Sequence, residues 1–363
     1  MTDTEAYVAL NLIPRLGPVR LRRLRDALGS PQRILDAKAD ELRSIEGIGP
    51  EAAKSIANWR ELVSLDNELA AVEKFGAMIL IQSDEAYPPL LREIHDPPTV
   101  LYVWGKLEPR DRHAIGVVGT RKPSHYAQDS AKKLSYQLAY AGLTVVSGLA
   151  RGIDTSAHQG ALAAKGRTLA VIGAGLNCLY PPENRELAEK IAESGAVLSE
   201  FPMNTAADRQ TFPMRNRIVS GWSFGTLVVE AGVKSGAIIT ANQAAEQGRS
   251  IYVVPGRMDN PSAFGSNRLI QQGAKLVMGA QDILDDLSIL FPRQPDLPVP
   301  ATPAELSEPE SRIYEALGVE ECFVDELVAK SGLPSPVVSS TLLGLELRRL
   351  VKTLPGGRYV RLI

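Results

Sequence analysis

The sequence predicts an α/β protein whose central domain is a doubly wound, mostly parallel sheet. Short β-branched segments that are apolar on both faces alternate with helical patterns through the middle of the chain, as buried parallel strands and crossover helices do. Most of these segments end in a loop rich in glycine, hydroxyl or basic residues. We expect four parts: a helical domain at 1–65, the sheet domain at 66–290, a proline-rich linker at 291–305 and a winged-helix domain at 306–363.

Composition places the chain among ordinary globular proteins. Of its 363 residues, 44% are hydrophobic and 23% are charged, and the formal net charge is −2. No apolar run approaches the length of a membrane span, and residues 1–30 lack an apolar signal core, so we expect a cytoplasmic protein with no membrane partner. Because the net charge is near zero, any nucleic-acid site must be a local cluster of positive charge.

Residues that would indicate catalysis or a cofactor are sparse. Cys178 and Cys322 are far apart and the four histidines are scattered, which predicts neither a disulfide framework nor a metal site. The Gly173-x-Gly175 pattern lacks the third glycine of a dinucleotide fingerprint, and the chain has no Walker loop. We therefore predict no cofactor, no metal and no catalytic residues.

An internal repeat marks the helical domain at 1–65. Residues 13–18 match residues 45–50, and a helical pattern follows each copy. The second copy resembles a helix-hairpin-helix turn, whose glycines allow close approach to a phosphate backbone. In the first copy Arg15 takes the place of the first glycine, and five arginines lie between residues 15 and 25. A DNA-binding hairpin and a helical protein-binding module both remain open.

Alternating strand and helix patterns define the sheet domain. The predicted strands lie at 78–81, 100–103, 115–118, 143–146, 168–172, 196–198, 226–229 and 251–254. Helical patterns at 126–140, 183–193 and 237–247 each stop at a glycine, and Ser235 suits an N-cap. Repetition of this unit gives parallel strands joined by right-handed crossovers.

The loops after these strands are expected at the carboxyl edge of the sheet, where such folds bind ligands. The most distinctive stretch is 145–158, in which a strand runs through Ser-Gly into a loop with Arg151 and a second glycine. We predict Asp154 as the N-cap of the following helix and Gly166 as its end. A glycine loop before a helix offers free backbone N–H groups to an anion, so its repetition predicts a long, shallow anion-binding surface.

Residues 212–221 add polar groups before the next strand. Arg215 and Arg217 stand two residues apart on a predicted helix and cannot share a face. We expect one of them to face the carboxyl edge and the other to pair with an acid such as Glu230. The aromatic candidates for stacking on a base, with a core position as the alternative, are Phe212, Trp222 and Phe264.

Six motifs are spread over roughly residues 70–285. They are Ser-Gly-Leu-Ala-Arg-Gly-Ile-Asp at 147–154, Tyr-Pro-Pro-Glu-Asn at 180–184, Ser-Glu-Phe-Pro at 199–202, Phe-Pro-Met-Arg-Asn-Arg at 212–217, Ser-Gly-Ala-Ile-Ile-Thr-Ala at 235–241 and Val-Pro-Gly at 254–256. Together they resemble the DNA-processing protein A family, which is also called DprA or Smf. A resemblance carried by this many separate motifs is far more specific than one loop.

The resemblance implies an extended Rossmann-like domain that binds and protects single-stranded DNA. It also implies a homodimer that loads the RecA recombinase onto incoming strands in natural transformation. In the family the arginine of a Gly-x-Arg loop is a main phosphate ligand, and here it falls on Arg121. A basic residue often follows the Tyr-Pro pair; here Pro182 takes its place, and Arg185 lies three residues on. The residues expected to bind DNA are Gly119, Arg121, Lys122, Ser147, Gly148, Arg151, Gly152, Gly175, Arg185, Arg215, Asn216, Arg217, Lys234, Ser235 and Gly236.

Three helical patterns and a hairpin after the linker predict the winged-helix domain. The helical patterns cover 308–317, 324–330 and 335–349, and the hairpin joins 350–354 to 358–362. A third helix that reads DNA should present Arg, Asn or Gln to base edges, and here only Arg348 and Arg349 are basic. We expect this domain to contact protein or to play an auxiliary role.

Two other functions stay open. Residues 221–230 faintly resemble the loop of phosphoribohydrolases that cleave nucleoside monophosphates, but they lack its Pro-Gly-Gly and place Glu230 one residue late. A winged-helix regulator with a ligand-sensing core would prefer one duplex sequence. The leading prediction is a non-enzymatic single-stranded DNA-binding protein of recombination.

Overall fold

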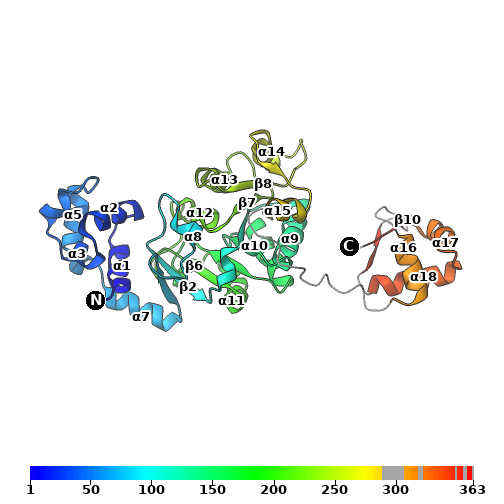
Figure 1. The fold of residues 1–363 in the computed structure, drawn as a ribbon, viewed down its shortest axis with the longest axis horizontal. Helices are drawn as coiled ribbons and strands as arrows, with labels where there is room; N and C mark the ends of the chain where they lie inside the picture. The colour runs from blue at the N-terminus through cyan, green and yellow to red at the C-terminus, as the bar shows by residue number, and fades with distance from the viewer. Residues whose placement is uncertain (288–305, 318–321, 348–349, 355–357, 362–363) are drawn as a thin grey trace. The chain divides into compact units, whose positions relative to one another are not determined.

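The computed structural model describes residues 1–287, 306–317, 322–347, 350–354 and 358–361. The chain divides into two compact units, residues 1–290 and 291–363 (Figure 1). The predicted linker at 291–305 lies outside the described residues. In the part of the chain that is described, no helix is both long enough and apolar enough to cross a membrane.

A nine-stranded sheet forms the centre of the first unit, in the order β1-β2-β6-β5-β4-β3-β7-β8-β9. Strands β3 to β9 run parallel to one another, whereas β2 pairs antiparallel with β6 and β1 antiparallel with β2. This confirms the predicted mostly parallel sheet. The strands are β1 (Met78–Ile81), β2 (Val100–Gly105), β3 (Ala114–Val118), β4 (Thr144–Ser147), β5 (Thr168–Val171), β6 (Ala196–Ser199), β7 (Gly225–Val228), β8 (Ser250–Val253) and β9 (Lys275–Leu276).

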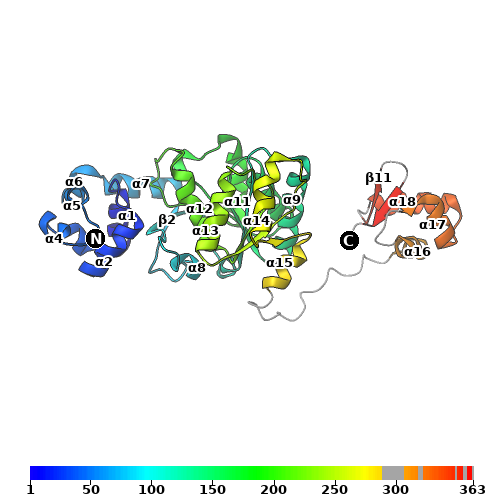
Figure 2. The ribbon, with the colours of Figure 1, turned by 90° about the horizontal axis from the view of Figure 1, so that it is seen from above.

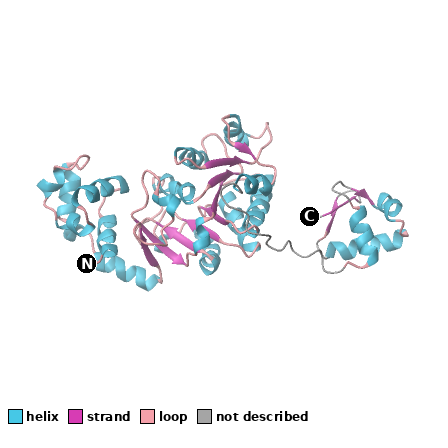
Figure 3. Cartoon of the chain, in the orientation of Figure 1, coloured by secondary structure: helices cyan, strands magenta, loops and turns pink. Residues whose placement is uncertain are grey.

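Helices cover both faces of this sheet (Figure 3). Ile191 and Val197 belong to the core on one face, whereas Trp222 and Leu198 belong to the core on the other, because neighbouring strand residues point to opposite sides. Helices α9, α10 and α11 lie on the first face, and α12 and α13 on the second. The helices of this part are α8 (Pro89–Arg92), α9 (His125–Tyr140), α10 (Ile153–Ala163), α11 (Arg185–Ser194), α12 (Thr211–Trp222), α13 (Gly236–Glu246), α14 (Phe264–Gln271) and α15 (Ala280–Leu287).

Helix α10 ends at Ala163 and not at Gly166, the predicted end. Lys165 takes the left-handed conformation, with a φ of 53°, that glycine usually supplies after a helix. Gly166 instead permits close packing against α9, because a Cβ at this position would lie 2.7 Å from the Cβ of Ala139.

The predicted repeat near the N-terminus forms two turns with the same backbone conformation. Arg15 and Gly47 both have positive φ, 64° and 82°, and Gly17 and Gly49 are the N-caps of α2 and α5. Arg15 therefore holds a conformation that favours glycine. The helices of this region are α1 (Asp3–Leu12), α2 (Pro18–Leu28), α3 (Pro31–Asp36), α4 (Ala39–Arg43), α5 (Pro50–Ala57), α6 (Trp59–Leu62) and α7 (Leu65–Phe75).

The second unit has three helices and a small antiparallel sheet in the order β10-β12-β11. Its core includes Ile313, Leu327 and Leu342. Arg348, Arg349 and the predicted turn at 355–357 lie outside the described residues. The elements are α16 (Glu308–Ala316), α17 (Val324–Ser331), α18 (Ser335–Leu347), β10 (Cys322–Phe323), β11 (Val351–Leu354) and β12 (Arg358–Arg361).

Candidate nucleic-acid interface

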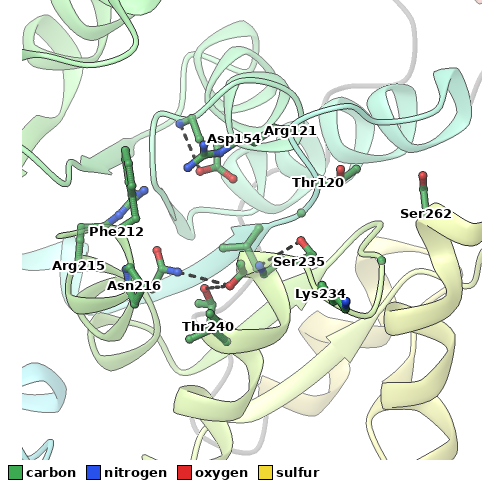
Figure 4. Close-up of a pocket in the computed structure, with 18 of the residues that line it drawn as sticks. Thr120, Arg121, Asp154, Phe212, Arg215, Asn216, Lys234, Ser235, Thr240 and Ser262 are labelled. Carbon is green, nitrogen blue, oxygen red and sulfur yellow. Dashed lines mark hydrogen bonds between the residues drawn. The ribbon is translucent and has the colours of Figure 1, made fainter. Parts of the chain in front are cut away.

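The carboxyl edge of the large sheet holds a pocket of about 660 Å³ beside the end of β3. From β3 the chain winds outward in both directions, so the pocket lies where the strand order reverses, the usual ligand position in such folds. Its walls come from the loops after β3, β4, β7 and β8, from the first turn of α10, and from α12 and α13 (Figure 4). The predicted site residues that line it are Gly119, Arg121, Arg215, Asn216, Lys234, Ser235 and Gly236.

Exposed cations surround this pocket. The Arg121 guanidinium lies 4.8 Å from the centre of the Phe212 ring, and Lys234 lines the pocket from the loop before α13 (Figure 4). Arg209 adds a third exposed cation, which the sequence pattern did not suggest. The one feature of the sequence that could have indicated Arg209 is its position three residues before Phe212. Proteins that bind single-stranded nucleic acids combine positive charge with aromatic rings in this way.

The N-terminus of α13 adds to this positive character. Ser235 caps the helix as predicted, and its hydroxyl accepts a hydrogen bond of 3.3 Å from the amide of Ala237. Gly236 and Thr240 of the same helix line the pocket. Because a helix N-terminus carries about half a positive charge, it favours an anion at this position.

Arg215 is a buried wall of the pocket. It is only 3% exposed, and its guanidinium donates a hydrogen bond to the carbonyl of Val171. Burial lowers the pKa of Arg215 to about 10, while the Asp154 carboxylate opposes that shift. A Cβ on Gly148 would lie 1.8 Å from Nη1 of Arg215, so this approach requires glycine. Gly148 of the motif therefore leaves the space that the Arg215 guanidinium occupies.

Asp154 is not the N-cap of α10 that we predicted. Gly152 takes that position with a φ of 79°, and Asp154 lies in the first helical turn. The buried Asp154 carboxylate accepts hydrogen bonds from the amides of Gly148 (3.1 Å) and Ala150 (3.3 Å). These two amides, which we expected to be free for an anion, are therefore already used within the loop.

Arg217 lies outside the pocket lining. It is buried and forms ion pairs with Asp96 (2.9 Å) and Glu200 (2.6 Å). The expected pairing with Glu230 is wrong, because that carboxylate accepts hydrogen bonds from the amide and hydroxyl of Ser124, at 3.0 and 2.6 Å. In a phosphoribohydrolase, Glu230 would have to face the substrate. Here its carboxylate is instead hydrogen-bonded to Ser124. Arg217 is therefore held within a buried ionic cluster and not presented to the pocket.

Several other predicted residues lie at the edge of the pocket or outside it. Gly148 and Arg151 line a small adjoining pocket with Tyr180 and Phe212, and Lys122 is exposed next to Arg121. The Arg151 side chain pairs with Glu183. Arg185 instead lines a separate cavity beside Phe75 and Trp104.

The remaining candidates occupy tightly packed positions. The Ser147 hydroxyl is buried and donates to the carbonyl of Val117 at 2.6 Å. A Cβ on Gly152 or Gly175 would lie 2.4 or 2.1 Å from a backbone carbonyl oxygen, so both positions need glycine for close packing. Trp222 is a core residue whose indole donates to the carbonyl of Asp111, and Phe264 is exposed but does not line the pocket.

His158 lies buried in α10. Its Nδ1 lies 2.7 Å from the Thr168 hydroxyl, which itself donates to the carbonyl of Val145, so Nδ1 carries the proton. Burial, with a smaller effect from the charge of Arg215, lowers the pKa of His158 to about 3.

We expect His158 to weaken the fold as the pH falls below 6.5. The unfolded chain takes up a proton near pH 6.5, whereas the folded protein keeps the ring neutral down to about pH 3. Between these values this histidine lowers the free energy of unfolding by about 1.4 kcal/mol for each pH unit of acidification. Urea unfolding at pH 7 and pH 5 should show a steeper loss for the wild type than for His158→Asn. Equal losses would contradict the assignment of a neutral buried ring.

Comparison with known proteins gives three matches to family models. Residues 78–288 match the family described as DNA recombination-mediator protein A. Residues 298–357 match the DprA winged helix domain, and residues 8–58 match the SAM-like helix-hairpin-helix tandem. These matches agree with the predicted fold class of the chain.

Individual relatives cover much of the chain. Protein Smf from Synechocystis sp. is 36% identical over 389 residues, which cover 98% of both chains. The structure of DNA processing protein A from Streptococcus pneumoniae is 32% identical, has a TM-score of 0.69, and covers 79% of this chain and 98% of its own. DNA processing protein A from Helicobacter pylori, a protein with a single-stranded DNA binding mode, is 27% identical with a TM-score of 0.53, covering 59% and 97%.

These findings agree with the motifs that carried the sequence resemblance. The family model alone spans more than half of the chain, and the Synechocystis relative aligns along almost all of it. The chain belongs to the DNA recombination-mediator protein A family, whose members are DNA-binding recombination mediators and not enzymes.

Proposed function

We propose that the pocket at the carboxyl edge and its rim bind the backbone of single-stranded DNA. The observation that carries this proposal is the convergence of Arg121, Arg209, Lys234 and the α13 N-terminus on one pocket. Phosphates are attracted both by such cations and by a helix N-terminus. Phe212 is half-buried beside Arg121, and the exposed part of its ring is where an unpaired base would stack, which a base inside a duplex cannot do.

We further propose that the protein protects incoming strands and presents them to RecA, in the cytoplasm and as a homodimer. Membership in a family of recombination mediators supports this role, as does the single-stranded DNA binding of the Helicobacter pylori relative. The test is the rate at which RecA assembles on single-stranded DNA with and without the protein. An unchanged rate would reject the loading step and leave DNA binding itself untouched.

Binding itself is tested by fluorescence anisotropy with a labelled oligonucleotide and the duplex of the same sequence. We expect the single strand to bind more tightly, since the duplex hides its bases from Phe212. Tighter binding of the duplex, or a preference for one duplex sequence, would overturn the proposal and favour a regulator.

Removal of residues 306–363 should leave single-strand binding nearly unchanged. The cations of the pocket all lie in the first unit, and α18 has no Arg, Asn or Gln between residues 335 and 347. Anisotropy titration of the truncated and full chains should give dissociation constants within a few-fold of each other. A loss of more than about tenfold, or roughly 1.4 kcal/mol, would show that the second unit belongs to the main site.

A further inference from the structure

We propose that the outer face of α9 continues the path of the strand from the pocket toward the opposite edge of the sheet. This inference rests on the proposed function. Helix α9 begins at His125, four residues after Arg121, and ends at Tyr140, four residues before β4 starts at the amino edge of the sheet. Figure 2 shows α9 close to α15, a helix that it contacts. Its 16 residues span about 24 Å.

Three tyrosines on this helix are exposed to solvent. Tyr126 is 57% exposed, Tyr136 42% and Tyr140 53%, although large aromatic side chains normally bury most of their surface. The rings of Tyr136 and Tyr140 are nearly parallel, at 5°, with centroids 6.2 Å apart. Neither ring lines the pocket at the carboxyl edge, so DNA binding in that pocket gives no role to this pair.

Basic side chains accompany the tyrosines along the helix. Lys132 and Lys133 are exposed on the same helix and have no ion-pair partner among the described residues. At the C-terminal end of α9, Tyr140 lines a cleft of about 280 Å³ together with Arg110 and Lys165. The face therefore alternates rings with cations, as a track for single-stranded DNA does.

The acidic side chains near this face make their contacts with groups other than the α9 lysines. Asp129 of α9 lies 3.4 Å from Nδ1 of His125, a contact that is an ion pair only when the histidine is protonated. Helix α15 contacts α9 and is acidic, but Asp282 accepts the amide of Met278 and Asp286 pairs with Lys275. None of these carboxylates pairs with Lys132 or Lys133, so both lysines remain available to phosphates.

The position of this face favours the strand over a protein partner. Lys122 and Tyr126 follow Arg121 directly in the chain, and Asp129 is the one carboxylate of α9 between them and the tyrosine pair. Cores of protein interfaces are poor in lysine, whereas this face interleaves lysine with tyrosine. At 3.4 Å for each stacked nucleotide, a helix 24 Å long accommodates about seven.

The experiment compares Tyr136→Ser/Tyr140→Ser with Tyr136→Phe/Tyr140→Phe, which keeps both rings. Phe264→Ser, which removes an exposed ring on α14, serves as the control away from the path. Each variant is titrated by anisotropy with oligonucleotides of about 4 and about 16 nucleotides, the range of single-strand site sizes. Circular dichroism and light scattering record folding and oligomeric state.

We expect the double Tyr→Ser variant to lose about tenfold or more in affinity, and only for the longer strand. The double Tyr→Phe variant and Phe264→Ser should bind both strands as the wild type does. Equal affinities of wild type and Ser variant for the longer strand would overturn the inference, while binding of the short strand would keep the proposed function. A Ser variant with altered mass in solution would overturn it in favour of an interface between copies. Failure of the wild type to bind either strand would instead reject the proposed function.

Discussion

Affinity for single-stranded DNA should rise by about 10²–10⁴-fold once an oligonucleotide is long enough to occupy both pockets of a homodimer. One pocket of about 660 Å³ holds only a short stretch of a strand. Two-fold dimers are the commonest assemblies, and a dimer would place two such pockets on one strand. A protein with a net charge of −2 would then bind tightly without a globally basic surface.

A titration of oligonucleotide length against wild type and a monomeric variant measures this step. The step should disappear in the monomer, whereas any effect of Tyr136 and Tyr140 acts within one subunit and should persist there. A smooth length dependence that is the same for both forms would reject the two-pocket arrangement and leave single-strand binding in place.

Replacement of Arg217 by alanine should lower the free energy of unfolding by about 3–5 kcal/mol, because it removes one partner of a buried ionic cluster. Arg217 is 4% exposed and holds both Asp96 and Glu200. Its removal would leave the buried Glu200 carboxylate without a counter-charge. Burial already raises the pKa of Glu200, and Arg217 opposes that shift.

The loss caused by Arg217→Ala should therefore shrink at acidic pH, where Glu200 becomes neutral and no longer needs the arginine. Urea unfolding at pH 7 and pH 5 measures both effects. Arg185→Ala, at an exposed position outside the pocket, is the matched control and should stay within about 0.5 kcal/mol of wild type. An Arg217 variant as stable as this control would contradict a structural role for the cluster.

The alternation of strands, loops and helices could be predicted from the sequence because it depends on local patterns. Each predicted strand is present within two residues, and Ser235 caps α13 as expected. Strand β9 was missed because two exposed residues, Lys275 and Leu276, carry no periodic signal.

What the sequence could not supply is the choice of partners across long separations. Arg217 meets Asp96, which lies 121 residues away, and Glu230 meets Ser124, 106 residues away. Spacing showed that Arg215 and Arg217 must diverge, but not which of them faces the pocket. Nor could the glycine-rich pattern show that Asp154 accepts hydrogen bonds from two backbone amides of the loop.

Arg121 and its neighbours are expected to neutralise the phosphates of a single strand. The measurement is the salt dependence of binding for wild type, Arg121→Ala and Arg257→Ala. Arg257 is an exposed arginine paired with Asp259 in another carboxyl-edge loop, so it serves as the matched control.

If about four phosphates are neutralised, the slope of log K against log salt should be near −3 for wild type and for the Arg257 variant. Loss of Arg121 should reduce the steepness by about 0.7 and weaken binding by roughly tenfold or more, as expected for one charge-assisted hydrogen bond. Unchanged affinity together with an unchanged slope for Arg121→Ala would contradict the account.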